Sequence, residues 1–265
     1  FTRGPGLLGS LLVGTSFAKG LAIANNIPMV EVNHLQGHIL SHFVDLPDRE
    51  LPHPSYPFLC LLVSGGHTQI VKVSSPLEME IIGTTIDDAA GEAFDKAARV
   101  LTLPYPGGPR IDALAEEGDP HYMLLPHPHT PGRYDYSFSG LKTAALNLIH
   151  HAYQVGEELD INSLCAAFTA AVSDTLVPRV TMALEQTGYK KIAVAGGVAA
   201  NSRIRADILA AAEKLGAEVY MPPLSLCGDN GAMIGAQAYY EYLAGNTADM
   251  SLNAYATKSI LGEAL

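Results

Sequence analysis

Short apolar runs alternate along the chain with longer segments that have helical periodicity. The short runs are bounded by turn residues, which is typical of buried strands, and they lie at residues 28–32, 58–63, 190–194 and 218–221. The spacing of apolar positions predicts helices at residues 6–24, 33–42, 86–103, 110–117, 141–152, 161–187, 202–215 and 232–243. Strands that alternate with helices predict an α/β fold.

Three segments depart from this simple alternation. A Gly-Gly pair at 65–66 joins the run at 58–63 to an alternating run at 67–73, which predicts a β-hairpin. Residues 118–136 are rich in Pro, His and Gly and predict an irregular loop. The segment 6–24 is apolar but is interrupted by glycines and a lysine, so it predicts a buried helix and not a membrane span.

The composition is that of a globular protein with a surplus of acidic residues. Of the 265 residues, 48% are hydrophobic, and 27 acidic against 16 basic residues give a net charge of −11. Such a chain lacks the bulk positive charge that holds proteins to nucleic acid or anionic membranes unaided. Three cysteines are too few for a disulfide scaffold, and the first residues do not resemble a signal peptide. We therefore expect a cytoplasmic protein with reduced thiols and no membrane partner.

Two histidines in the segment 33–42 have the spacing of metal ligands. His34 and His38 are four residues apart, which puts both imidazoles on one helix face within reach of one ion. Two histidines that only pack the helix are the simpler alternative. His42 lies about 12 Å further along such a helix and is expected to be a bystander. A metallopeptidase of the H-E-x-x-H type needs Glu after the first histidine, where this chain has Leu35, so that activity is weakly supported.

Two glycine-containing turns follow predicted strands and could approach a nucleotide. Ser64, Gly65 and Gly66 end a buried strand, where backbone N–H groups could reach phosphate oxygens, although a simple tight turn is an alternative. Residues 195–201 leave a strand and open a helix, and Asn201 could donate to a ribose or a base. This second turn has neither the Gly-Lys-Ser/Thr of a Walker loop nor a G-x-G-x-x-G pattern.

Three acidic residues are not explained by local structure alone. Asp95 lies beyond the first turn of the helix predicted at 86–103, where the dipole that explains Asp87 has faded. Asp112 follows a Gly-Gly break and is a candidate for binding a hydroxyl group. Asp229 could complete a His/His/Asp metal set, although alone it would be interpreted as a turn residue.

Taken together, the chain resembles the tRNA threonylcarbamoyladenosine transferase family of the TsaD type. The resemblance is carried by N-H-L-Q-G-H at 33–38, L-V-S-G-G-H-T at 62–68 and C-G-D-N-G-A-M at 227–233. Further matching segments, in the order of the family, are residues 4–7, 86–96, 105–109, 137–143 and 195–201. The matching segments cover essentially the whole chain.

The resemblance implies an actin/Hsp70/sugar-kinase-like (ASKHA) architecture of two ribonuclease H-like halves, with a nucleotide and a metal between them. Residues 1–56 with 234–265 would form the first half, which carries the metal-binding helix. Residues 57–233 would form the second half, which carries the nucleotide site. The family begins with a strand-turn-strand segment of about 75 residues that has no counterpart before Phe1, so we expect the first half to be incomplete.

The resemblance also implies the reaction and its residues. The family transfers a threonylcarbamoyl group from threonylcarbamoyl-AMP to N6 of the adenosine 3′ of the anticodon, in tRNAs that read codons beginning with A. By position, a divalent ion, iron or zinc, would be held by His34, His38 and Asp229. The adenylate would be bound by Leu62, Val63, Ser64, Gly65, Gly66, Asp95, Gly108, Asp112 and Asn201.

Partners and alternatives follow from the same resemblance. It implies a paralogous ASKHA partner protein and the small ATPase of the bacterial modification complex. With a net charge of −11, tRNA binding is expected to need a local basic patch or partner subunits. Gln36 replaces the family's Glu between the two histidines, which removes a charge but no ligand. The alternatives are a non-catalytic nucleotide-binding scaffold of the same fold and, weakly, a metallopeptidase. No general base can be assigned from the sequence.

Overall fold

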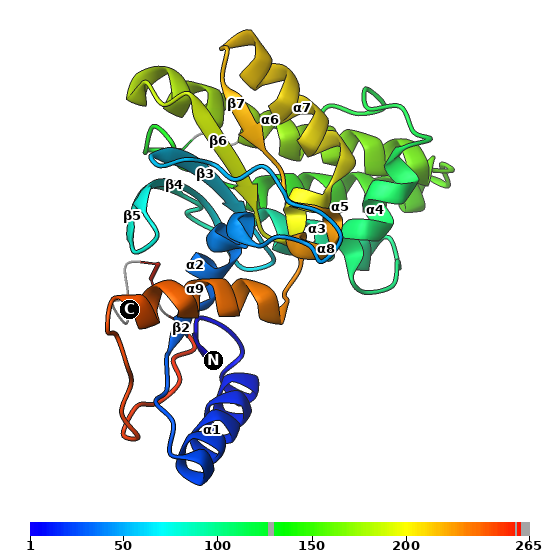
Figure 1. The fold of residues 1–265 in the computed structure, drawn as a ribbon. Helices are drawn as coiled ribbons and strands as arrows, with labels where there is room; N and C mark the ends of the chain where they lie inside the picture. The colour runs from blue at the N-terminus through cyan, green and yellow to red at the C-terminus, as the bar shows by residue number, and fades with distance from the viewer. Residues whose placement is uncertain (127–129, 258, 261–265) are drawn as a thin grey trace.

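A five-stranded mixed sheet dominates the computed structural model, which describes residues 1–126, 130–257 and 259–260 (Figure 1). The strand order is β5-β4-β3-β6-β7. The antiparallel side is formed by β3 (Phe58–Val63), β4 (Thr68–Ser75) and β5 (Glu78–Thr84). On its other edge β3 runs parallel to β6 (Lys191–Ala195), which is followed by the parallel strand β7 (Glu218–Tyr220).

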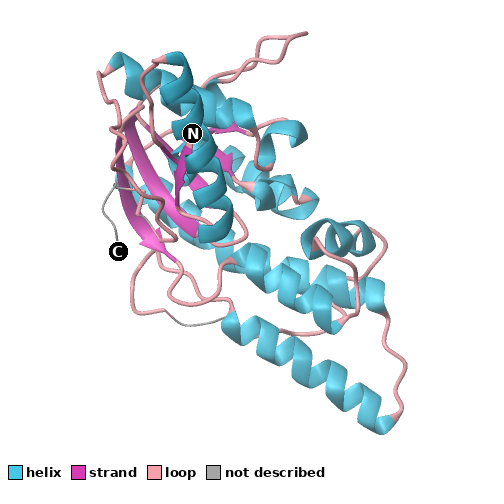
Figure 2. Cartoon of the chain, turned by 90° about the horizontal axis from the view of Figure 1, so that it is seen from below, coloured by secondary structure: helices cyan, strands magenta, loops and turns pink. Residues whose placement is uncertain are grey.

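The central strand β3 is buried on both faces. Alternate side chains of β3 enter a larger core with α3 (Ala90–Val100), α4 (Gly107–Ala115), α5 (Ser139–Val155), α6 (Ile161–Thr187) and α7 (Ser202–Lys214). The side chains between them enter a second core with α2 (His34–Leu40). All six residues of β3 are buried, which explains why its sequence is a continuous apolar run instead of an alternating one. Figure 2 shows the strands gathered in one part of the molecule with helices packed beside them.

A second, smaller assembly holds the beginning and the end of the described chain. The strand β1 (Thr2–Gly4) pairs in parallel with β2 (Val32–Asn33), and α1 (Leu8–Asn25) packs on β1. The helix α2 lies between β3 and β6 on one side and α9 (Gly231–Leu243) on the other (Figure 1). The connecting short helices are η1 (Ser41–Phe43), η2 (Gly197–Ala200) and α8 (Leu224–Cys227).

The predicted helix at 6–24 forms, but the prediction that it is buried is wrong. Val13 is 72% and Phe17 69% exposed, and the buried positions on α1 are Leu11, Thr15 and Ala22. The helix packs mainly on the narrow strand β1, so most of its apolar surface meets no neighbour in the described chain. An apolar sequence indicates that a helix has surface to bury, but it does not say which segment covers it.

One strand prediction needs correction, and one strand is missing from the predictions. The strand predicted at 28–32 pairs only from Val32 onward, while Met29 forms an isolated bridge with Ala248. Pro28, at the start of the predicted strand, has no backbone N–H to donate to a ladder. The strand β5 was not predicted. Its sequence carries Glu at alternate positions, and in the structure it is the edge strand, where charged side chains are normal.

The helix predicted at 86–103 begins only at Ala90, because the acidic residues before it serve other contacts. Asp87 accepts hydrogen bonds from the backbone N–H groups of Phe138 at 2.8 Å and Ser139 at 3.3 Å, and from the hydroxyl groups of Ser137 and Ser139. Asp87 therefore caps the start of α5, not its own helix as the dipole argument predicted. The other helices and the Gly-Gly hairpin are confirmed within a few residues. The irregular loop 118–136 is also confirmed, apart from residues 127–129, which lie outside the described residues.

Candidate functional site

Two histidines and one aspartate meet at the base of α2. The Nε2 atoms of His34 and His38 lie 3.3 Å and 3.2 Å from the Oδ1 of Asp229. The two imidazole rings are 4.7 Å apart at their centres and nearly perpendicular. One ligand atom from each of the three residues lies within 4.8 Å of the other two. The predicted metal ligands, which are far apart in sequence, are therefore brought together.

Helix caps place these three side chains. The side chain of Asn33 accepts hydrogen bonds from the backbone N–H groups of the second and third residues of α2, so the helix begins at His34. One helical turn then separates His34 from His38 on the same face. Asp229 stands in the loop between α8 and α9, next to Asn230, whose side chain caps α9 by accepting from the backbone N–H of Met233 at 2.9 Å.

The donor set fits a divalent transition metal. Two imidazole nitrogens and one carboxylate oxygen are ligands that both zinc and non-haem iron take, with further positions open to substrate. The side chain of His38 is only 2% exposed, and its Nδ1 is buried without a hydrogen-bond partner in the described part of the chain. Hydrogen bonds from His34 and His38 hold the pKa of Asp229 well below its usual range, so its carboxylate stays ionised and able to bind a cation.

His42 stands apart from this cluster, as predicted. It is 5% exposed, and its Nε2–H donates to the carbonyl oxygen of Val194 at 2.9 Å. Burial lowers the pKa of His42 to about 4. The position that Glu occupies in H-E-x-x-H peptidases is held here by Leu35, which is 1% exposed in the second core. A peptidase mechanism therefore lacks its base at that position.

The three metal-site residues open into a cleft of about 650 Å³. The cleft is also lined by Ser64, Gly65, Gly66, His67 and Gly197, and by the start of α1. The turn after β3 and the turn after β6 meet here because the two strands are parallel neighbours at the centre of the sheet. Ligands of open α/β sheets bind at the carboxyl ends of such strands, where the connections diverge.

Glycine is required where the turns around the cleft touch. Gly196 has a φ of +94°, and a Cβ there would lie 2.3 Å from the carbonyl oxygen of Val63. At Gly91, the second residue of α3, a Cβ would lie 2.6 Å from the carbonyl oxygen of Ser64. By contrast, a Cβ at Gly65, Gly66 or Gly197 would meet no atom within 4 Å. At Gly196 and Gly91 the missing side chain lets backbone segments pack closely. At the other three glycines it leaves open space along the cleft.

The residues predicted to bind the adenylate have structural partners of their own. The Oδ1 of Asp95 accepts from the backbone N–H of Gly107 at 2.8 Å. The carboxylate of Asp112 accepts from the backbone N–H and the hydroxyl of Ser202 at 3.1 Å and 2.8 Å, which ties α4 to the start of α7. The side chain of Asn201 caps α7. A role for these three residues in adenylate binding stays a prediction.

The remaining predicted adenylate residues differ in what they expose. Leu62 and Val63 are fully buried in β3, so their side chains pack in the two cores and only backbone at the strand end faces the turn. Gly108 has open space at its Cβ position, at the start of α4. Sequence reasoning missed His67, whose place directly after the Gly-Gly pair was the available signal. Burial, together with the charges of His34 and His38, lowers the pKa of His67.

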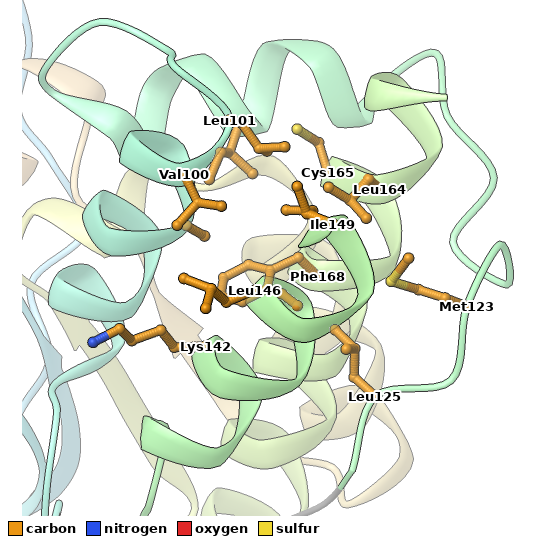
Figure 3. Close-up of a pocket in the computed structure, with 13 residues that line it drawn as sticks. Val100, Leu101, Met123, Leu125, Lys142, Leu146, Ile149, Leu164, Cys165 and Phe168 are labelled. Carbon is orange, nitrogen blue, oxygen red and sulfur yellow. The ribbon is translucent and has the colours of Figure 1, made fainter. Parts of the chain in front are cut away.

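A second cavity, inside the larger core, is not a candidate site. It lies between α3, α5 and α6 and is lined by apolar side chains, with Lys142 at its edge (Figure 3). Its volume of about 10 Å³ has room for one water molecule at most, and an apolar void of this size normally stays empty. It is a gap in side-chain packing.

Comparisons with known proteins identify the family. A family model described as TsaD, tRNA N6-adenosine threonylcarbamoyltransferase, matches residues 1–236. The chain belongs to the TsaD family. A tRNA N6-adenosine threonylcarbamoyltransferase of Christiangramia forsetii is 48% identical over 257 residues, covering 96% of this chain and 75% of the relative. One of Porphyromonas gingivalis is 50% identical over 251 residues, covering 93% of this chain and 73% of the relative.

Solved structures support the fold of this TsaD-family chain. Full-length HypF has a TM-score of 0.59 at 16% identity, covering 87% of this chain and 38% of HypF. HypF of T. kodakarensis has a TM-score of 0.57 at 15% identity, covering 88% of this chain and 39% of that one. The predicted family and the predicted α/β fold of ASKHA type are confirmed.

The predicted division into two halves and the possibility of a membrane-spanning helix complete the description of the fold. The predicted division into 1–56 with 234–265 and 57–233 stays a prediction, and residues 258 and 261–265 lie outside the described residues. Within the described ranges, no helix combines the length and the apolar character that crossing a lipid bilayer requires.

Proposed function

We propose that this chain transfers a threonylcarbamoyl group from threonylcarbamoyl-AMP to N6 of the adenosine 3′ of the anticodon, in tRNAs that read codons beginning with A. One observation carries the proposal: the His34, His38 and Asp229 cluster and the glycine turns after β3 and β6 open into the same cleft of about 650 Å³. This volume lies in the usual range for sites that enclose a nucleotide-sized ligand. The transferase name of the relatives favours catalysis over a non-catalytic scaffold.

The metal site would stand at one end of the bound adenylate. Iron or zinc, when bound by His34, His38 and Asp229, supplies Lewis-acid stabilisation of the negative charge that develops on the carbamoyl oxygen. Asp229 is a carboxylate at neutral pH, so it can bind a cation without first losing a proton. The burial of His38 fixes the direction of its imidazole, because the surrounding side chains leave it little freedom to rotate.

The glycine turns would hold the phosphate end. Because Gly65, Gly66 and Gly197 place no side chain in the cleft, phosphate oxygens can come close to the backbone N–H groups of the turns. Asp112, in the middle of α4, is hydrogen-bonded to the first residue of α7, and Asn201 caps that helix, so a carboxylate and an amide that could bind ribose hydroxyls stand near each other. Both ends of the adenylate would then be fixed relative to the carbamoyl carbon.

In the reaction, the N6 nitrogen forms a bond to the carbamoyl carbon, and the bond from that carbon to the phosphate oxygen breaks. AMP leaves with the electron pair, and N6 loses one proton. The exocyclic amine of adenine is a weak nucleophile, whereas AMP is a good leaving group. Positioning of the amine against the carbonyl should therefore provide much of the rate enhancement.

The partners are proposed from the family resemblance, the need for them from the net charge, and the location from the thiols. With a net charge of −11, we expect tRNA affinity to depend on a local basic patch or on partner subunits, namely a paralogous ASKHA protein and a small ATPase. All three cysteines are free and buried, which suits the reducing cytoplasm, where tRNA is modified.

A cleft-filling variant tests the proposal. Gly66→Val would place a side chain in open space in the cleft, and Gly140→Val, at the exposed start of α5, is the matched control because its Cβ also meets nothing within 4 Å. Each chain is incubated with threonylcarbamoyl-AMP and a tRNA transcript, and modified adenosine is measured by mass spectrometry of the nucleosides. We expect transfer by the wild type and Gly140→Val and loss in Gly66→Val at unchanged melting temperature. Wild-type transfer by Gly66→Val would contradict the proposed site, and tight adenylate binding without transfer by the wild type would favour the scaffold.

A further inference from the structure

A hydrogen-bonded pair of amides, one half-buried and one buried, joins the metal-binding helix α2 to α9. Gln36 lies on α2 between the two histidines, and Gln237 lies on α9 with 1% exposure. The Nε2 of Gln237 donates to the Oε1 of Gln36 and also to the Oε1 of Glu241 at 3.3 Å. Beside this pair the helices are in close contact, since a Cβ at Gly37 would lie 3.2 Å from the Cδ1 of Ile234.

The C-terminal part of the described chain holds the same turn of α2 from another direction. The Nε2 of Gln36 donates to the carbonyl oxygen of Ile260 at 2.9 Å. The Nδ2 of Asn33, which caps α2, donates to the carbonyl oxygen of Ser259 at 2.8 Å. Gln36 therefore serves as donor on one side and acceptor on the other, which a carboxylate or an apolar side chain at this position could not do.

The placement of α9 decides where the third metal-site residue lies. Asp229 precedes α9 by two residues, and the side-chain cap of Asn230 ties this loop to the first turn of the helix. A small shift of α9 along α2 would therefore move the carboxylate of Asp229 relative to the imidazoles of His34 and His38. Zinc and iron need all their ligand atoms at about 2.0–2.2 Å, so such a shift weakens binding.

We propose that the hydrogen bond between Gln36 and Gln237 positions the metal ligands and sets the affinity and geometry of the ion site, although neither glutamine is a ligand. This inference rests on the proposed function in that it takes His34, His38 and Asp229 as the metal site. Hydrogen-bonded residues behind metal ligands commonly change metal affinity by about 10–100-fold when they are replaced.

Metal titrations of four variants test this role. Gln36→Met and Gln237→Met remove one amide each at nearly constant volume, and the double variant removes both. Gln186→Met, on the exposed side of α6, is the matched control. Zn²⁺ affinity is measured by competition with a chromophoric chelator, and the visible absorption of bound Co²⁺ reports the coordination geometry. Thermal unfolding of the metal-free chains is measured in parallel.

We expect each single variant to raise the Kd for Zn²⁺ about 10-fold and to alter the Co²⁺ spectrum, with no change in Gln186→Met. The double variant should bind about as weakly as the weaker single variant, because the two amides act as one unit. A lower melting temperature with unchanged Kd and Co²⁺ spectrum would overturn the inference, since the pair would then be merely structural. If Gln237→Met does not fold, the half-buried Gln36→Met decides by the same readouts. A wild-type chain that binds neither ion would overturn the proposed metal site and this inference with it.

Discussion

Burial of His42 makes the stability of the chain depend on pH in the mildly acidic range. The side chain is 5% exposed and donates its Nε2–H to the carbonyl oxygen of Val194. The neutral imidazole can already make this hydrogen bond, so no positive charge is needed for it. Burial lowers the pKa of His42 from its ordinary value of 6.5 to about 4. Between these two values the unfolded chain binds a proton at His42 and the folded chain does not, so the free energy of unfolding falls as the pH falls.

The size of this effect follows from the difference of 2.5 between the two pKa values. Each pKa unit corresponds to about 1.4 kcal/mol, so His42 should lower the free energy of unfolding by about 3 kcal/mol on going from pH 7 to pH 4. Well above pH 6.5 the imidazole is neutral in both states and the loss vanishes. At pH 4.5 most of it, about 2–3 kcal/mol, should already be present.

Urea unfolding of the wild type and of His42→Gln between pH 4.5 and 7.5 measures this contribution. Glutamine keeps a neutral N–H donor for Val194 but does not titrate. We expect the wild type to lose about 2–3 kcal/mol more than the variant between pH 7 and 4.5, even if the variant is less stable at neutral pH. His67, whose pKa is also lowered, titrates in both chains and cancels in the comparison. His121→Gln, at an exposed position, should follow the wild type. Parallel curves for the wild type and His42→Gln would refute the reasoning.

Three further changes test the packing described above. Asp87→Ala should lower the free energy of unfolding in urea by about 2–3 kcal/mol, because it leaves the start of α5 without its hydrogen-bond acceptor. The control Asp48→Ala, on an exposed loop, should change it very little. Equal unfolding midpoints for the two variants would contradict the capping role. Gly196→Ala should destabilise the chain by more than about 2 kcal/mol, whereas Gly197→Ala should not, and thermal unfolding compares them. Phe17→Lys should reduce self-association in light scattering, because Phe17 is 69% exposed on α1; unchanged scattering would show that this surface does not drive association.

The local part of the candidate site could be predicted from the sequence. The spacing of His34 and His38 fixes a shared helix face as soon as Asn33 caps the helix, and the structure places both rings on one carboxylate. The buried run of β3 followed by Gly65 and Gly66 likewise predicts a strand and a turn with open backbone. These features depend on residues within a few positions of one another.

The parts that could not be predicted depend on neighbours far along the chain. Asp87 looked like the acidic start of its own helix, but its partners lie 50 residues later at the start of α5. From the sequence, Gln36 indicated only the loss of a negative charge between the two histidines. Its hydrogen-bond partner Gln237 lies 201 residues away, so the residues around Gln36 carry no sign of the contact. The apolar sequence of α1 indicated burial, whereas Phe17 on that helix is largely exposed in the described chain. Local propensity carries no information on such pairings.

The central claim is that a metal ion held by His34, His38 and Asp229 and the transfer to tRNA belong to one site. The most direct test measures metal content and modified adenosine in the same preparations of the wild type, His38→Ala and His42→Gln, with the partner proteins present in each assay. The account predicts about one ion per chain and modified tRNA for the wild type and His42→Gln, and neither for His38→Ala. Full modification of tRNA by a His38→Ala chain that carries no metal would contradict it.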